Sequence, residues 1–157
     1  MDNTKLPYRP CTGVMLLNPD GKVFVGQRID TTMEAWQMPQ GGIDEGEDPE
    51  TCAFRELEEE IGTKNAKVIA RTGNWLTYDL PDNLVGKVWG GKFRGQKQIW
   101  FLMRFLGDDS EIDLETHHPE FKTWKWVDTR DLPELIIPFK RDLYLAVIKE
   151  FTEFLKE

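Results

Sequence analysis

The chain has 157 residues, of which 39% are hydrophobic and 31% are charged, and it contains no run of about 18 apolar residues. Its first residues, MDNTKLPYRP, lack the apolar stretch expected of a signal peptide. We therefore expect a cytoplasmic protein with a single domain over residues 1–157 and no membrane partner. The formal net charge of −8 argues against the basic surface of a general nucleic-acid binder, so we expect no DNA partner, although an acidic site can still hold phosphates through bridging metal ions.

The first third of the sequence alternates between apolar runs and turn signals. Residues 12–17 (TGVMLL) predict a buried strand, and residues 18–21 (NPDG) predict a tight turn. Residues 22–27 (KVFVGQ) then predict the second strand of a hairpin. A short extended segment follows at residues 36–39, directly before two glycines.

A helix is predicted over residues 49–61. Asp48 can cap its N-terminus, Pro49 suits its first position, and Gly62 suits the position after its last turn. On a helical wheel, one face is apolar and is expected to pack against the core: Ala53, Phe54, Leu57 and Ile61.

A second face of this helix carries Glu56, Glu59 and Glu60, three and four residues apart. These carboxylates repel one another, and they lie in the last turns, where the helix dipole disfavours negative charge. A divalent cation such as Mg²⁺, which prefers oxygen ligands, would convert this cost into a binding site. The alternative is a solvated acidic face, which is the more common explanation of an isolated acidic run.

The second half of the sequence predicts more strands and one further helix. Residues 80–97 contain four glycines and predict a loop, and apolar residues at helical spacing predict an amphipathic helix over 139–156. Strands interleaved with two helices favour a mixed α/β sandwich. Strands are expected at residues 68–72, 74–79, 98–105 and 123–127, with Trp75, Trp100 and Trp126 in the core.

Residues 41–63 read GGIDEGEDPETCAFRELEEEIGT. This stretch resembles the Nudix box, and only Thr63 departs from it, because an apolar residue is usual there. The resemblance implies a Nudix-type α/β/α sandwich with a mixed central sheet. The positions in register are Gly41, Glu47, Arg55, Glu56, Leu57, Glu59, Glu60 and Gly62.

The resemblance also implies what these residues do. Arg55 is expected to pair with Glu47 and to hold the loop against the helix. The cofactor is expected to be Mg²⁺, or Mn²⁺ in its place, and the number of ions stays open. The implied metal ligands are the carbonyl of Gly41 and the carboxylates of Glu56, Glu59 and Glu60.

Six further blocks resemble the bacterial RNA pyrophosphohydrolases and the related dinucleoside polyphosphate (Ap4A) hydrolases. They are YRPCTGVML, WQMPQGGI, NWLTYDLP, GQKQIWFL, PEFKTWKWV and IPFKRDLY. The resemblance implies removal of pyrophosphate from 5′-triphosphorylated RNA, a step of mRNA decay. The runner-up is asymmetric hydrolysis of Ap4A to ATP and AMP, and the spelling KFRGQKQ resembles that second group.

Residues outside the box complete the implied site. Glu120 matches a carboxylate that can reach a metal or the attacking water, and the general base stays open among Glu56, Glu60 and Glu120. Arg9 also matches a basic position that could bind phosphate, but a solvated surface cation explains it equally well. His117 and His118 are expected in a solvent-facing loop. The implied substrate-binding residues are Arg28, Gln40, Tyr78, Lys97, Phe139 and Lys140, with an ordinary surface position as the alternative for each cation.

Two other functions remain open at this point. A non-catalytic Nudix module that binds nucleotides or RNA would be expected to lack metal carboxylates, and this chain has all three. A hydrolase of oxidised nucleotides or of ADP-ribose would share the box but not the six outer blocks. Oligomeric state is not indicated by the sequence.

Overall fold

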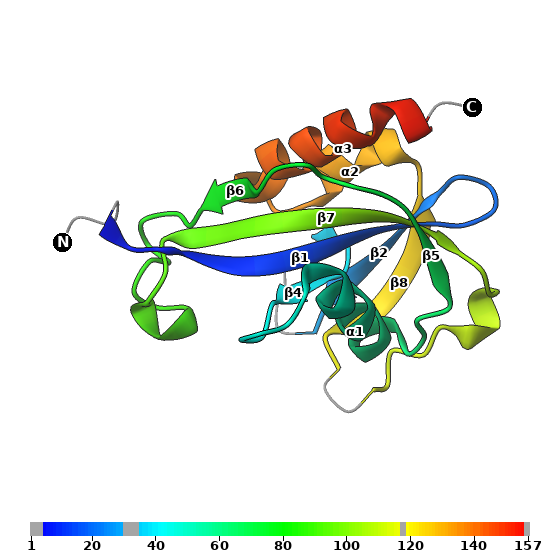
Figure 1. Ribbon diagram of the computed structural model, residues 1–157, viewed down its shortest axis with the longest axis horizontal. Coiled ribbons are helices and arrows are strands. Elements are labelled where there is room, and N and C mark those ends of the chain that lie inside the picture. Colours follow the sequence, from blue (N-terminus) through cyan, green and yellow to red (C-terminus); the bar gives the residue numbers. More distant parts are fainter. Residues whose placement is uncertain (1–4, 30–34, 117–118, 156–157) are drawn as a thin grey trace.

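The computed structural model describes residues 5–29, 35–116 and 119–155, and it shows a three-layer α/β/α sandwich (Figure 1). Helix α1 (Pro49–Ile61) covers one face of a mixed sheet, and α2 (Leu132–Leu135) and α3 (Arg141–Leu155) cover the other. The expected fold class is confirmed. The strands are β1 (Tyr8–Leu17), β2 (Val23–Arg28), β3 (Trp36–Gln37), β4 (Gln40–Gly42), β5 (Ala66–Arg71), β6 (Leu76–Asp79), β7 (Gly95–Phe105) and β8 (Phe121–Val127).

The sheet is built around β1, in the order β3-β2-β1-β7-β5. β1 and β7 run parallel, from Tyr8 opposite Gly95 to Leu17 opposite Arg104, and the other ladders among the described residues are antiparallel. β4 pairs with the first half of β1, and β6 pairs with the first part of β7. The starts of β1 and β7 therefore meet β4 and β6 at one end of the sheet.

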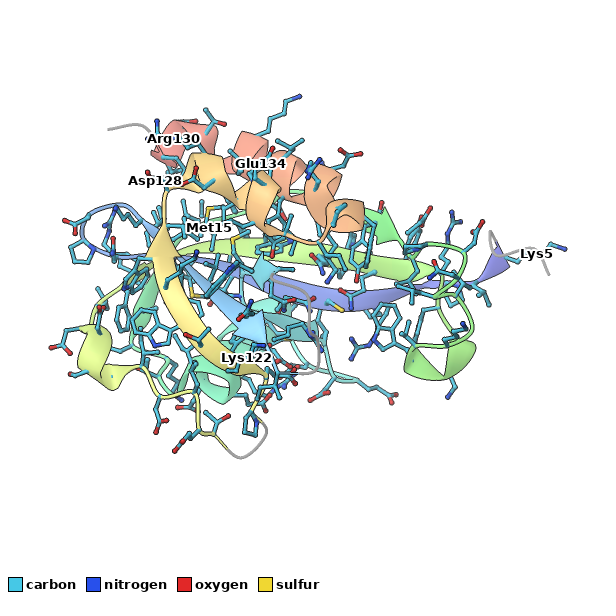
Figure 2. The ribbon with its side chains drawn as sticks, turned by 180° about the vertical axis from the view of Figure 1, so that it is seen from behind. Lys5, Met15, Lys122, Asp128, Arg130 and Glu134 are labelled. Carbon is cyan, nitrogen blue, oxygen red and sulfur yellow. The ribbon has the colours of Figure 1, made fainter. Side chains whose placement is uncertain are left out.

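Alternation along the strands divides the core into two layers. In β1, Met15 packs toward α2 and α3, as Figure 2 shows, whereas Leu16 packs toward α1. α1 contributes Ala53, Leu57 and Ile61 to its layer, and α3 contributes Leu143, Val147 and Phe151 to the other. Burial on both faces explains why residues 13–17 of β1 and residues 99–103 of β7 are apolar without interruption rather than alternating with polar residues.

Helix α1 begins and ends at the predicted residues. The Asp48 side chain accepts a hydrogen bond from the N–H of Thr51 at 3.2 Å. Gly62 adopts the left-handed conformation, with φ of 82°, and its N–H donates to the carbonyl of Glu58 at 2.9 Å. These caps fix the position of the acidic face along the helix.

The predicted hairpin turn is present, but the ladder between its two strands is confined to the pair Leu17 and Val23 next to the turn. The side chain of Asn18 accepts hydrogen bonds from the N–H groups of Asp20 and Lys22, which closes the turn. β1 starts at Tyr8 rather than at residue 12, and its long partner is β7, whereas β2 pairs over its length with β8. A parallel partner lies across a long connection, so the local turn signal cannot reveal it.

Three other expectations need correction. Trp100 is fully buried as expected, but Trp75 precedes β6 and is 41% exposed, and Trp126 is only partly buried. β7 begins at Gly95, inside the predicted loop, and the last helix begins at Arg141 after a 3₁₀ turn over Pro138–Lys140. His117 and His118 lie outside the described residues. Within the described ranges, no helix has the length and apolar character to cross a membrane.

Candidate active site

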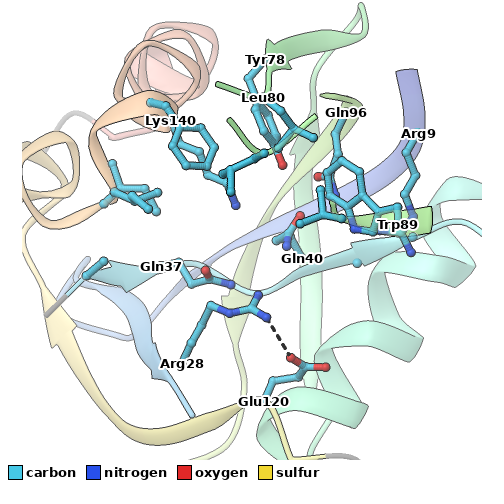
Figure 3. A pocket seen from close by; sticks show the side chains of 18 of the residues that line it. Arg9, Arg28, Gln37, Gln40, Tyr78, Leu80, Trp89, Gln96, Glu120 and Lys140 are labelled. Atoms are coloured by element: carbon cyan, nitrogen blue, oxygen red, sulfur yellow. Dashed lines mark ion pairs between the residues drawn. The ribbon is translucent and has the colours of Figure 1, made fainter. Parts of the chain in front are cut away.

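A cavity of about 450 Å³ lies at the end of the sheet where β1 and β7 begin (Figure 3). Its walls come from distant parts of the chain, which the sheet brings together: the start of β1, the region of β3 and β4, α1, the connection from β6 to β7, and the segments before β8 and α3. Most of its polar side chains are charged groups or amides. They are Arg9, Arg28, Gln37, Gln40, Glu56, Glu60, Gln96, Glu120 and Lys140.

Two carboxylates of α1, Glu56 and Glu60, line this cavity. Glu60 is only 3% exposed, and it accepts a hydrogen bond from the backbone N–H of Gln40 at 3.1 Å. Burial raises the pKa of Glu60 well above its usual range. Burial also raises the pKa of Glu56 to about 7, although Arg55 opposes the shift. Two neighbouring carboxylates whose ionisation is costly favour the binding of a cation between them and an anionic ligand.

Arg55 joins the loop after β4 to helix α1. Its Nε donates to Glu47 Oε2 at 2.7 Å and its Nη2 donates to Oε1 at 2.8 Å, so the expected contact is present in bidentate form. These hydrogen bonds lower the pKa of Glu47 to about 2. Arg55 also donates to the carbonyl of Gly42 and, at 2.9 Å, to Glu56 Oε1. One guanidinium thus orients both the loop and a carboxylate of the cavity.

Gly41 and Glu59 occupy different surroundings. A Cβ atom at Gly41 would overlap the carboxyl group of Glu56, so a larger residue here would displace this carboxylate from its position in the cavity. Glu59 is exposed, lies outside the lining of the cavity, and accepts a hydrogen bond from Arg55 Nη1 at 3.2 Å. Over residues 5–29, 35–116 and 119–155, no three His, Cys, Asp or Glu side chains gather as a ready-made metal cluster.

An aromatic and basic group faces these carboxylates from the side of α3. The rings of Tyr78 and Phe139 lie 5.9 Å apart, and the ammonium of Lys140 lies 5.2 Å from the centre of the Tyr78 ring. Burial, with the charge of Arg28 adding to it, lowers the pKa of Lys140 to about 8. A flat apolar surface beside a cation suits a nucleobase with an attached phosphate.

Two more cations line the cavity. Arg28, at the end of β2, lies 3.8 Å from the carboxylate of Glu120, as the dashed line in Figure 3 shows. Arg9 lies over the ring of Trp89, 5.6 Å from its centre. Trp89 has φ of 51°, and no other non-glycine residue in the described part of the chain has a positive φ. Trp89 is a large cavity residue that the sequence analysis did not single out.

Comparison with known proteins now identifies the family. The NUDIX domain model matches residues 7–147. An RNA pyrophosphohydrolase of Sphingopyxis alaskensis is 63% identical over 153 residues, which cover 96% of this chain and 97% of the relative. One of Roseobacter denitrificans is 58% identical over 149 residues, covering 94% and 93%. The chain belongs to the NUDIX family.

Solved structures give the same fold. The E. coli dihydroneopterin triphosphate pyrophosphohydrolase matches with a TM-score of 0.69 and 18% identity, covering 94% of this chain and 99% of that one. A C. elegans Ap4A hydrolase in a binary complex matches with a TM-score of 0.66 and 19% identity, covering 94% and 97%. At these identities the likeness supports the NUDIX fold and says nothing of substrate.

NUDIX proteins generally use divalent metal cations, and the residues of this site fit one. Glu56 and Glu60 supply oxygen ligands inside the cavity, and Gly41 lets the backbone come against them. Burial raises the pKa of both carboxylates, so ionising both without a cation is costly. A divalent ion would remove that cost.

The structure brings most of the expected site residues together, although their roles stay predictions. Glu59 and Lys97 lie outside the lining, and the ammonium of Lys97 lies 4.7 Å from the centre of the Trp75 ring. Arg55 lies behind the cavity and acts on it through Glu56. Those in the lining are Arg28, Gln40, Gly41, Glu56, Glu60, Tyr78, Glu120, Phe139 and Lys140, together with Arg9.

Proposed function

We propose that this NUDIX enzyme is a Mg²⁺-dependent RNA pyrophosphohydrolase that converts a 5′-triphosphate end to a 5′-monophosphate and releases pyrophosphate. The supporting observation is the match, at 52–63% identity over nearly the whole chain, to proteins with that name. The cavity agrees with this reaction, because it combines carboxylates, cations and two neighbouring aromatic rings that are tilted by 43°. Cytoplasmic mRNA decay is the process in which such a reaction belongs.

The chemistry assigned to this site is the attack of water on a phosphorus of the triphosphate. Mg²⁺, when bound by Glu56, Glu60 and the Gly41 carbonyl, would neutralise phosphate oxygens and lower the pKa of water. Arg55 holds Glu56 in place through a 2.9 Å hydrogen bond, and the Gln40 N–H holds Glu60. The carboxylates therefore do not have to reorganise when the substrate enters.

A proton must leave the attacking water, and three carboxylates of the lining can receive it: Glu56, Glu60 and Glu120. Glu120 differs from the other two because it comes from the segment before β8 and pairs with Arg28. Its backbone carbonyl accepts a hydrogen bond from the N–H of Ile29, which fixes it at the end of β2. We propose that Glu120 completes the metal and water site from this side.

Binding of the RNA end is assigned to the cations and the aromatic rings of the cavity. Lys140, Arg28 and Arg9 contribute positive charge for phosphates in an otherwise acidic protein. Tyr78 and Phe139 contribute the stacking surface for the first base. This division leaves the acidic helix for chemistry, and the cations and aromatic rings for recognition.

The test compares two substrates. A short 5′-triphosphorylated RNA and Ap4A are supplied at matched concentrations with Mg²⁺, and kcat/KM is measured for each. We expect the larger value for RNA, with pyrophosphate as the released product. A far larger kcat/KM for Ap4A would replace the proposal with the Ap4A reaction, and binding of both without turnover would indicate a non-catalytic module.

A further inference from the structure

Three amide side chains and one indole form a hydrogen-bonded chain beneath the cavity. The indole Nε1 of Trp100 donates to Gln98 Oε1 at 2.7 Å. Gln98 Nε2 donates to Gln96 Oε1 at 2.6 Å and to Gln40 Oε1 at 3.0 Å. Gln96, Gln98 and Trp100 are between 0% and 2% exposed, so water does not compete for these bonds.

The indole fixes the direction of every bond in this chain. An indole N–H can only donate, so the atom of Gln98 that faces Trp100 must be its oxygen. The amide nitrogen of Gln98 then faces the other way, and it can only donate. The atoms of Gln40 and Gln96 that receive its two hydrogens must therefore be their oxygens.

The remaining ends of the two outer amides are consequently both NH₂ groups. Gln40 and Gln96 line the cavity. In the described part of the chain, every buried side-chain nitrogen or oxygen has a hydrogen-bond partner, and no protein acceptor is recorded for either of these nitrogens. The two NH₂ groups therefore open onto the cavity. Gln40 is held a second time, because its backbone N–H donates to Glu60.

We propose that Gln98, anchored by Trp100, is a positioning residue that makes Gln40 and Gln96 present hydrogen-bond donors to the substrate. An amide that can rotate offers an oxygen as readily as a nitrogen, and an oxygen would repel the acceptor-only oxygens of a polyphosphate. The fixed direction removes that choice before the substrate binds. The inference rests on the proposed function, since it assigns the two donors to the non-bridging oxygens of the 5′-triphosphate.

The experiment reverses the direction of the chain. In Gln98→Glu, the carboxylate still accepts from Trp100, but it can no longer donate, so the amides of Gln40 and Gln96 turn their NH₂ groups toward it. Donors become acceptors in the cavity. We expect KM for 5′-triphosphorylated RNA to rise by about a hundredfold or more, because each of the two lost hydrogen bonds to a charged group is worth about tenfold or more, with a smaller change in kcat.

A double-mutant cycle separates this effect from the added charge and from general damage. Gln96→Leu should raise KM about tenfold in the wild-type background, but less than about twofold when combined with Gln98→Glu, because the donor is already lost there. Gln37→Leu is the matched control. Gln37 is another amide of the cavity lining, and it takes no part in the hydrogen bonds among Gln40, Gln96, Gln98 and Trp100. The change in KM caused by Gln37→Leu should therefore be the same in both backgrounds.

Equal effects of Gln96→Leu in the two backgrounds would overturn the inference. Thermal melts check that each variant folds, and if Gln98→Glu does not fold, the uncharged isostere Gln98→Met takes its place in the same cycle. Calorimetric binding of inorganic pyrophosphate with Mg²⁺ keeps the two proposals apart. If the wild-type protein does not hydrolyse triphosphorylated RNA, the proposed function is refuted, and the inference is still tested by pyrophosphate binding. If Gln96→Leu lowers the pyrophosphate affinity equally with and without Gln98→Glu, the inference is refuted and the proposed function stands.

Discussion

The two sides of the cavity are built in different ways. The acidic side comes from one continuous stretch, residues 41–63, in which Arg55 ties the loop to helix α1. The opposite side is assembled from residues as far apart in the chain as Tyr78 and Lys140. In the proposed function the first side supplies metal ligands, Glu120 joins them from the segment before β8, and the second side binds the base. Most of the proposed metal ligands are thus encoded in one local stretch, whereas the proposed substrate contacts depend on the tertiary fold.

The largest expected effect comes from the acidic side. Glu60→Gln keeps an oxygen that can accept from the Gln40 N–H but removes the charge that a metal needs. We expect kcat to fall by on the order of a thousandfold for RNA, since metal assistance contributes several kcal/mol to such reactions. The melting temperature should stay the same or rise, because a costly buried carboxylate is removed.

One neighbour on the same helix is the control for this variant, and a second neighbour tests the metal assignment. Glu58→Gln changes an exposed carboxylate outside the cavity, and it should leave turnover within about twofold. Glu59→Gln should remove most activity if the box residues bind metal as the sequence implies, with the fold intact. Unchanged turnover in Glu59→Gln would restrict the metal ligands on this helix to Glu56 and Glu60. That result would agree with the present position of Glu59, which accepts a hydrogen bond from Arg55.

The next test of the acidic side removes the charge of Glu47, which accepts two hydrogen bonds from Arg55. Glu47→Gln should cost about 1–3 kcal/mol in the free energy of unfolding near pH 7, the range for hydrogen bonds to charged groups. The pKa of Glu47 is lowered from 4.5 to about 2, so its contribution is complete above about pH 4.5 and is lost as pH falls toward 2. The gap between wild type and variant in denaturant unfolding should therefore narrow over that interval. A gap that does not change with pH would contradict the assignment.

Local signals in the sequence predicted the helix of the acidic side, although Glu59 lies outside the cavity lining. Helix periodicity and capping place Glu56, Glu59 and Glu60 relative to one another without knowledge of the rest of the fold. The parallel pairing of β1 with β7 has no such local signal, and it is this pairing that sets Arg9 beside the start of β7. Trp75 was wrongly expected in the core because the strand-like pattern of the sequence begins before Leu76, where β6 actually starts.

Recognition of the base is expected to depend on the opposite side alone. Phe139→Leu removes a ring 5.9 Å from Tyr78 and should raise KM for triphosphorylated RNA by about tenfold, within the usual range for one stacking contact. Binding of inorganic pyrophosphate, which has no base, should change little. An equal loss for both ligands would mean that Phe139 shapes the phosphate site, and the division between the two sides would fail.

The charge of Lys140 gives a smaller effect that depends on pH. Its pKa is lowered to about 8, so the ammonium is present below that pH and is lost as pH rises through it. In the wild type, kcat/KM should fall by roughly fivefold above pH 8, because a neutral amine is a weaker donor to phosphate. Lys140→Arg keeps its charge over this range, so its profile should stay flatter. Matching declines in the two proteins would assign the titration to another group.

The smallest effect is expected at Lys97, where the sequence and the structure point in different directions. The motif GQKQ implied that Lys97 binds phosphate, but β7 alternates, so Gln96 lines the cavity while Lys97 lies over Trp75. Lys97→Met should change KM for a triphosphorylated dinucleotide by less than about twofold. Arg28→Met, at a cation inside the lining, is the matched comparison and should raise it several times more. If Lys97→Met raises KM only for longer RNAs, Lys97 and the exposed Trp75 contact the RNA beyond its first nucleotides. Recognition would then extend outside the cavity. A large effect on the dinucleotide itself would instead restore the role that the motif implied.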